Sequence, residues 1–252
     1  MFLFALVKLY EVESRKLSIK NYMNFALNFT SIVNTIISLV CFYCFFRIKR
    51  DIQTRKAQAQ EDQAIIDFKN FYFWYGMGYI IFVLPQFFLL SASWALTGGY
   101  IAGIFFIMAG NGYFLKISTY FIFPKYAKTA FWLVIGYGIA GIAANLIFPP
   151  HIYFNLNTHQ LVKEAGKLDT FFTLGLLPVI YFGILSILSY GLGAKDRYIR
   201  NRSLILVVGL LFIFIGAPVQ SFAEKTWQFV LANFFIIAGY PVLLSAILYR
   251  RE

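Results

Sequence analysis

The chain has 252 residues, of which 60% are hydrophobic and 20% aromatic, and its formal net charge at pH 7 is +11. In a soluble protein this charge would suggest nucleic-acid binding. Here the basic residues lie between long apolar runs, where they face lipid headgroups and set the orientation of membrane segments. No nucleic-acid-binding module is visible in the sequence, so we expect membrane lipids and not a nucleic acid as partners.

Seven apolar stretches are each long enough to cross a bilayer, because a spanning helix needs roughly 20 residues for a hydrocarbon core about 30 Å thick. We therefore predict an all-α, polytopic membrane protein, with a bundle of seven transmembrane helices over residues 21–252 and an N-terminal interfacial segment over residues 1–20. The predicted spans are Tyr22–Phe46, Phe71–Trp94, Tyr100–Phe123, Ala130–Phe148, Thr170–Leu192, Ser203–Phe222 and Trp227–Tyr249.

Two connections between these spans are long, Arg47–Asn70 and Pro149–Asp169. The first contains residues 50–63, rich in Gln, Ala, Lys and Arg, which can form a helix that extends a span or lies on the surface. The second contains His151 and His159 without a nearby pair of cysteines or carboxylates, and we interpret it as a solvated or interfacial loop.

The orientation follows from the distribution of basic residues. The N-terminal segment and the connections on its side of the membrane hold 7 Lys and Arg, whereas the opposite set holds 14. Because the more basic loops of membrane proteins face the cytoplasm, we predict an outside N-terminus and a cytoplasmic C-terminus in the cell membrane.

The acidic residues and the cysteines narrow the possible chemistry. All eleven acidic residues are predicted in loops or at span ends, which disfavours proton-coupled carriers that need a carboxylate inside the membrane. Cys41 and Cys44 are the only cysteines, and we interpret them as small buried residues on one helix face, since a metal site would need further ligands. The sequence therefore predicts neither a metal site nor a cofactor.

Lys116 is the only charged residue predicted well inside a span, and Asn111 lies close to it in the most polar stretch of the membrane segments. Lys116 either snorkels to the interface, pairs with another residue, or belongs to a site for an anionic ligand. Gln86, Asn145 and Gln220 are further polar residues in spans that proline or glycine can loosen. These five residues form our predicted ligand-binding set, although each also suits hydrogen bonding between helices.

Prolines and small residues suggest how the spans bend and pack. Pro85, Pro178, Pro218 and Pro241 interrupt four spans, each removing a backbone hydrogen bond, which either shapes the bundle or provides a hinge or a cavity wall. Small residues four apart occur at Gly99 and Gly103, and at Gly136, Ala140 and Ala144. This spacing lets helices approach closely, so we expect packing inside the bundle, with association of further copies left open.

A seven-helix chain with an outside N-terminus invites comparison with microbial rhodopsins, but span Trp227–Tyr249 has no lysine for a retinal Schiff base. In general layout the chain resembles the seven-helix sensory regions that precede bacterial kinases and cyclases. That resemblance implies a ligand- or lipid-binding sensor or receptor-like module, without its own catalytic domain, that acts through a separate cytoplasmic or membrane signalling partner.

Two other functions remain open on the sequence. Leu84-Pro85-Gln86 resembles the Pro-Gln pair of the SWEET and PQ-loop sugar carriers, which implies a facilitative transporter for a small solute. A structural or assembly subunit of a membrane complex is the third possibility, since phenylalanine is abundant. No motif for a nucleophile, a zinc protease or a phosphate loop is present, so we predict that the protein is not an enzyme.

Overall fold

The computed structural model describes residues 29–54, 59–88, 92–155, 160–164, 167–221 and 226–249. The predicted interfacial segment, residues 1–20, lies outside this part of the chain. Within it the helices are α2 (Phe29–Thr54), α3 (Ala59–Phe88), α4 (Ser93–Ile122), α5 (Ala127–Ile147), α6 (Lys167–Gly175), α7 (Leu177–Gly193), α8 (Arg197–Ser221) and α9 (Thr226–Leu248), with a 3-10 turn, η2, at Pro124–Tyr126.

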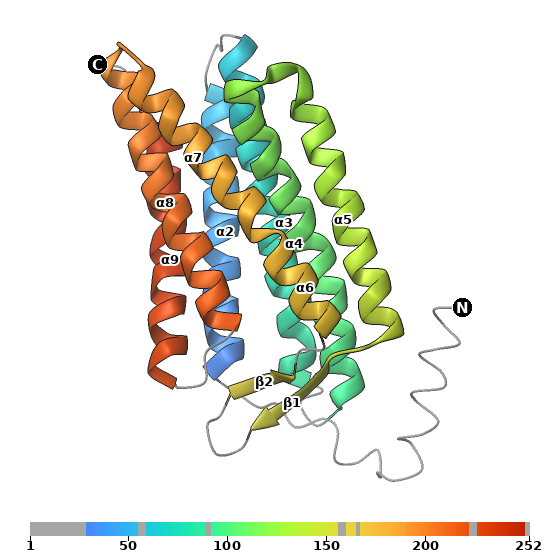
Figure 1. Cartoon of the computed structure of the whole chain (residues 1–252). Helices are drawn as coiled ribbons and strands as arrows, with labels where there is room; N and C mark the ends of the chain where they lie inside the picture. The colour runs from blue at the N-terminus through green and yellow to red at the C-terminus, as the bar shows by residue number, and fades with distance from the viewer. Residues whose placement is uncertain are drawn as a thin grey trace.

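These helices form an upright all-α bundle of seven rods, in which α6 and α7 count as one (Figure 1). The chain breaks at Leu176 between α6 and α7, and Pro178 lies in the first turn of α7, where a missing N–H costs little. Proline therefore interrupts this span as predicted, near its beginning.

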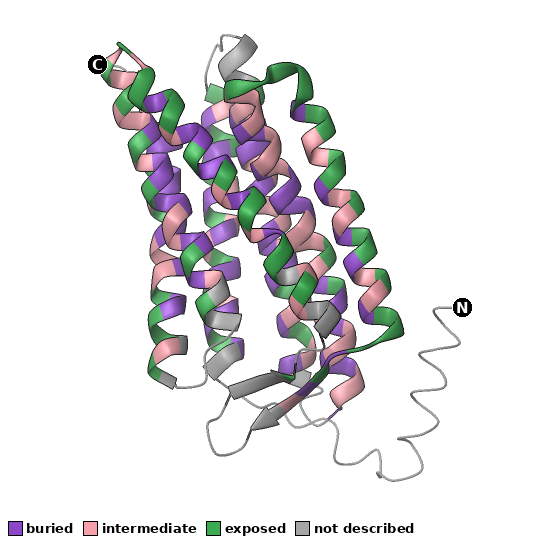
Figure 2. Cartoon of the chain, viewed as in Figure 1, coloured by how far each residue is buried: buried purple, intermediate pink, exposed green. Residues whose placement is uncertain are grey.

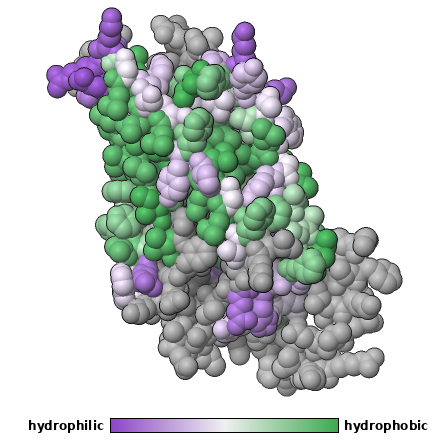
Figure 3. Space-filling model, in the orientation of Figure 1, coloured by the Kyte–Doolittle hydropathy of each residue, from purple (hydrophilic) through white to green (hydrophobic). Residues whose placement is uncertain are grey.

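Six helices in the described part of the chain are long and apolar enough to cross a membrane, which makes this a multi-pass membrane protein. The remaining long helix is α3, whose apolar stretch contains Tyr72, Tyr75, Tyr79 and Gln86. The space-filling view has a broad hydrophobic band between two ends where hydrophilic residues gather (Figure 3). Below, the end at which α9 terminates is called the C-terminal end, and the opposite one the hairpin end.

The helices contact one another in a ring. α2 packs against α3 and α9, α4 against α3 and α7, and α8 against α7 and α9, while α5 lies outside the ring against α4 (Figure 1). Buried residues line the inward faces and exposed residues the outward faces (Figure 2). The core cluster draws on α2, α3, α4, α7, α8 and α9, so the centre of the ring is filled by side chains.

The helix boundaries differ from the predicted spans, most of all around the Arg47–Asn70 connection. α2 continues to Thr54 and α3 already begins at Ala59, because the residues beyond the apolar runs are good helix formers. The predicted connection at Ala95–Gly99 is also wrong, since α4 begins at Ser93 and these residues are helical.

A two-stranded antiparallel hairpin occupies the connection that we interpreted as a loop. β1 (His151–Asn155) pairs with β2 (Gln160–Glu164), with His151 opposite Glu164 and Asn155 opposite Gln160. The Ser93 hydroxyl donates to the Ile152 carbonyl at 2.9 Å, which ties the hairpin to the beginning of α4. His159 lies outside the described residues.

Glycines bring two pairs of helix backbones into close approach. A Cβ on Gly103 of α4 would lie 3.0 Å from the Gly78 carbonyl of α3, and a Cβ on Gly239 of α9 would lie 2.8 Å from the Gly209 carbonyl of α8. Any larger residue at these positions would therefore have to separate the helices. The predicted role of Gly103 in close packing is confirmed, and α8 and α9 form a second tightly packed pair.

The small residues of α5 are arranged differently from our prediction. Gly136 and Ala140 are exposed on the outer face, and a Cβ on Gly136 would meet nothing within 4 Å. The packed residue is Gly138, where a Cβ would lie 2.8 Å from the Met108 Cβ of α4. The four-residue spacing marked a smooth face correctly, but it could not tell which side of the helix faces the bundle.

Candidate functional site

The inward face of α2 is polar over the half nearest the hairpin end. Ser31, Asn34 and Ser38 are each at most 1% exposed, and Cys41 and Cys44 continue the same buried row toward the C-terminal end. Their spacing of three or four residues places them on one side of a helix. The large exposed hydrophobic residues of α2 are Ile32, Ile36, Leu39, Tyr43 and Phe46. This helix therefore carries polar groups toward the bundle and apolar groups away from it.

A cluster of tyrosines from α3 and α9 packs against this row. Tyr72 and Tyr75 lie on the inward face of α3, and their ring centroids are 5.9 Å and 6.2 Å from that of Tyr240 on α9. The Tyr72 hydroxyl donates to the Tyr240 carbonyl at 3.0 Å, and the Cys44 thiol lies 4.0 Å from the same oxygen. Pro241 follows directly and removes a backbone donor from the interior of α9. This cluster joins α2 and α3 to α9.

Asn34 is the most unusual member of the polar row. Its side chain is 1% exposed, and neither its amide nitrogen nor its amide oxygen has a hydrogen-bond partner among the described residues. The Tyr240 hydroxyl is also buried and makes no hydrogen bond within the described part of the chain. Buried polar groups in native proteins are nearly always paired, so the unpaired carboxamide of Asn34 is a feature that calls for an explanation.

Asn111, one of the predicted site residues, contacts the tyrosine cluster. The Tyr75 hydroxyl donates to the Asn111 side-chain oxygen, and the Asn111 amide nitrogen lies 4.0 Å from the Met108 sulfur. Gly110 makes room for this contact, because a Cβ there would clash with the Tyr75 ring. Asn111 thus links α3 to α4 and borders the polar interior.

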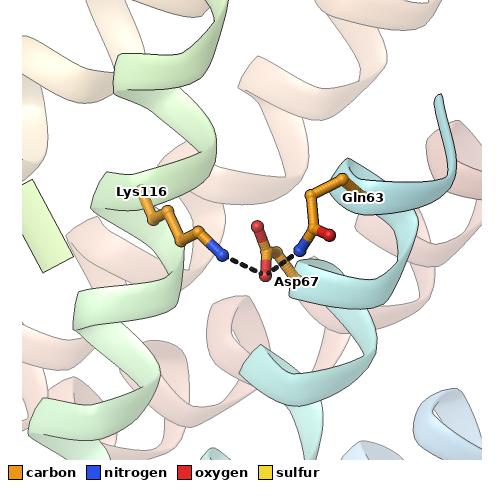
Figure 4. A network of polar contacts seen from close by, with 3 residues as sticks. All are labelled: Gln63, Asp67 and Lys116. Carbon is orange, nitrogen blue, oxygen red and sulfur yellow. Dashed lines mark hydrogen bonds and ion pairs between the residues drawn. The ribbon is translucent and has the colours of Figure 1, made fainter. Parts of the chain in front are cut away.

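Lys116 forms an ion pair with Asp67 near the C-terminal end of the bundle (Figure 4). Its ammonium lies 2.8 Å from an Asp67 carboxylate oxygen, which also accepts a 3.1 Å hydrogen bond from the Gln63 amide. The Lys116 side chain is 24% exposed and that of Asp67 only 5%. Of the alternatives left open by the sequence, structural pairing is the one observed.

This pair corrects the prediction that every acidic residue lies in a loop or at a span end. Asp67 is inside α3 and buried, whereas Asp51 is buried in the last turn of α2, at the end of that span as predicted. The prediction failed because it placed the helix ends at the limits of the apolar runs, whereas both helices extend past them. The absence of a buried carboxylate was the argument against proton-coupled carriers, and that argument no longer holds.

The remaining predicted site residues do not join this site. Gln86 is buried near the hairpin end of α3, eleven residues from Tyr75, and its amide donates to the Phe82 carbonyl at 3.0 Å. Asn145 is buried on α5, outside the ring. Gln220 belongs to the last turn of α8, and its side chain is outside the described part. The five predicted residues are consequently spread over four helices.

Sequence reasoning missed Asn34, Ser38 and the tyrosines of α3, although their spacing was visible. Polar residues recurring every three or four positions in an otherwise apolar span indicate an inward polar face. No three His, Cys, Asp or Glu side chains within the described ranges come together in a way that could hold a metal ion. No profile of a known protein family matches the chain, and no curated protein matches it.

Proposed function

We propose that this protein is a ligand-binding membrane sensor, and that its ligand is a small polar molecule seated against Asn34. The observation that carries the proposal is the buried carboxamide of Asn34, whose donor and acceptor both lack a hydrogen-bond partner among the residues that the structure describes. Leaving such a group unpaired costs about 1–3 kcal/mol, and a ligand with its own donor and acceptor removes this cost.

The position of α2 supports a sensing role. α2 packs against both α3 and α9. α3 is in close contact with α4 at Gly78 and Gly103, and α9 is in close contact with α8 at Gly209 and Gly239. A ligand on the inward face of α2 therefore sits where two tightly packed helix pairs meet. A change in its occupancy shifts one pair against the other, and a separate cytoplasmic or membrane partner reads the shift at the bundle ends.

The test compares Asn34→Leu with Asn111→Leu. If no ligand sits at Asn34, leucine removes an unpaired amide and the variant is more stable than the parent protein. If a ligand is present, native mass spectrometry of the purified parent protein detects a bound small molecule. Asn34→Leu then abolishes the binding of this molecule and lowers the stability of the protein. Asn111→Leu is the matched control, because it breaks the hydrogen bond from Tyr75 and lowers stability in both cases. A stabilised, ligand-free Asn34→Leu protein would overturn the proposal.

Facilitative transport of a small solute is the second candidate. It is favoured by Pro85 inside α3 and Pro241 inside α9, because each proline removes a backbone hydrogen bond and so weakens its helix at a point where it can bend. Solute flux through purified protein in liposomes, lost in Asn34→Leu, would promote transport over sensing. For either role we propose the cell membrane with the N-terminus outside, from the excess of basic residues at the C-terminal end.

A further inference from the structure

A groove of about 570 Å³ opens at the C-terminal end of the bundle, between the ends of α4 and α7 and the beginning of α8. Its lining includes Phe121, whose ring lies 5.2 Å from that of Tyr190, and the polar residues Ser189, Lys195 and Asp196. Aromatic rings beside hydroxyl and ammonium groups are typical of the boundary between lipid tails and headgroups.

A second, small cleft of about 30 Å³ lies between α4 and α7, and Ile122 lines both this cleft and the groove. This cleft is lined by Ser118 and Ile122 of α4 and by Phe182, Gly183 and Ser186 of α7. The two helices approach closely here, since a Cβ on Gly183 would lie only 3.1 Å from the Ser118 hydroxyl. The two helices therefore bound a groove with a polar mouth, and a small cleft lies beside it.

The outer surface of α4 and α7 beside the groove is strongly apolar and exposed. Phe123 at the end of α4 is 54% exposed, and Phe182, Leu185 and Leu192 on the outer face of α7 are 62%, 60% and 61% exposed. In a membrane protein these residues contact acyl chains. An acyl chain lying along the outer face of α7 would therefore place its headgroup at the mouth of the groove.

The mouth of the groove is basic. Residues 121–129 and 193–202, which surround it, contain six lysines and arginines and a single acidic residue, Asp196. A carboxylate oxygen of Asp196 accepts a 2.9 Å hydrogen bond from the Tyr198 backbone N–H, which engages it at the beginning of α8. Arg202 is directed to α9, where its Nε donates to the Ala246 carbonyl at 3.2 Å. Lys125, Lys128, Lys195, Arg197 and Arg200 are exposed and available to an anion.

We propose that this groove binds an anionic phospholipid, with the headgroup phosphate beside Lys195 and Ser189 and one acyl chain along the outer face of α7. Charge complementarity selects an anionic headgroup, and the exposed hydrophobic edge selects a lipid over a free phosphate. The lipid acts as a fixed component that holds α4 against α7.

The test measures phospholipid retention by native mass spectrometry of the detergent-solubilised protein, with phosphatidylglycerol and phosphatidylcholine of identical chains as probes. Phosphatidylglycerol is expected to be retained at least fivefold more than phosphatidylcholine. Lys195→Gln reduces this preference about fivefold, the effect of one basic residue at an anionic surface. Lys49→Gln is the matched control, because Lys49 is an exposed basic residue of α2 near the same end of the bundle.

A second variant blocks the groove without changing its charge. Gly193 lines the groove and a Cβ there would meet nothing within 4 Å, so we expect the side chain of Gly193→Leu to occupy part of the groove. It should lower phosphatidylglycerol retention by at least fivefold, while gel filtration shows an unchanged folded protein. The proposal would be overturned if Gly193→Leu left lipid retention unchanged, or if Lys195→Gln and Lys49→Gln reduced it equally. Displacement of the lipid by millimolar glycerol phosphate would also overturn it.

Discussion

Replacing Lys116 with methionine should destabilise the protein through Asp67. The change leaves the Asp67 side chain, which is 5% exposed, with the Gln63 amide as its one remaining hydrogen-bond partner among the described residues. Removing one member of a buried ion pair costs about 3–5 kcal/mol, and the lower end applies because Lys116 keeps part of its exposure to solvent. A loss of about 3 kcal/mol lowers the melting temperature by roughly 6–12 °C for a chain of this size. Tryptophan fluorescence of the protein in mild detergent measures this shift on heating.

A double variant separates the ion pair from the packing of its side chains. In Asp67→Leu with Lys116→Met both charges are gone, and stability should return to within about 1 kcal/mol of the parent, since an apolar pair avoids the cost of desolvation. Lys125→Met removes an exposed lysine and should change stability by less than about 0.5 kcal/mol. The reasoning is refuted if Lys116→Met behaves like Lys125→Met, or if the double variant is as unstable as Lys116→Met alone.

Three further outcomes are expected. Tyr72→Phe removes the hydrogen bond to the α9 carbonyl and should lower stability by about 1 kcal/mol in the same assay, and an unchanged melting curve would contradict the importance of that contact. Gly239→Leu forces α8 and α9 apart and should cost at least about 2 kcal/mol, whereas Gly136→Leu, whose side chain enters open space, should be neutral; equal effects would refute the packing argument. In intact cells an impermeant thiol reagent should label a cysteine at position 151 but not one at position 195, and the reverse pattern would invert the proposed topology.

The sequence predicted the class of fold because a bilayer leaves few alternatives. Each run of about 20 apolar residues has to form a helix, since its backbone groups find no water in the hydrocarbon core. The helix ends were harder to predict. Residues 47–70 are polar, and their helix formation depends on propensity and packing, so the extension of α2 to Thr54 and the beginning of α3 at Ala59 were not visible in hydropathy.

The site was predicted only in part, because hydropathy cannot tell which face of a helix points inward. Lys116 and Asn111 were identified as isolated polar residues within an apolar span, and both are engaged inside the bundle. Asn34 was overlooked because a single asparagine hardly changes the mean hydropathy of its span. Asp67 was assigned to a loop, and its pairing with Lys116 depends on the register between α3 and α4, which close glycine packing determines.

An experimental structure of the protein in lipid nanodiscs, at a resolution that shows ordered waters, tests the central claim most directly. We expect density for a non-protein molecule larger than a water within about 3 Å of both the amide nitrogen and the amide oxygen of Asn34. Hydrogen bonds from Asn34 to protein groups alone, or to a single water, would contradict the account of a ligand seat at this position.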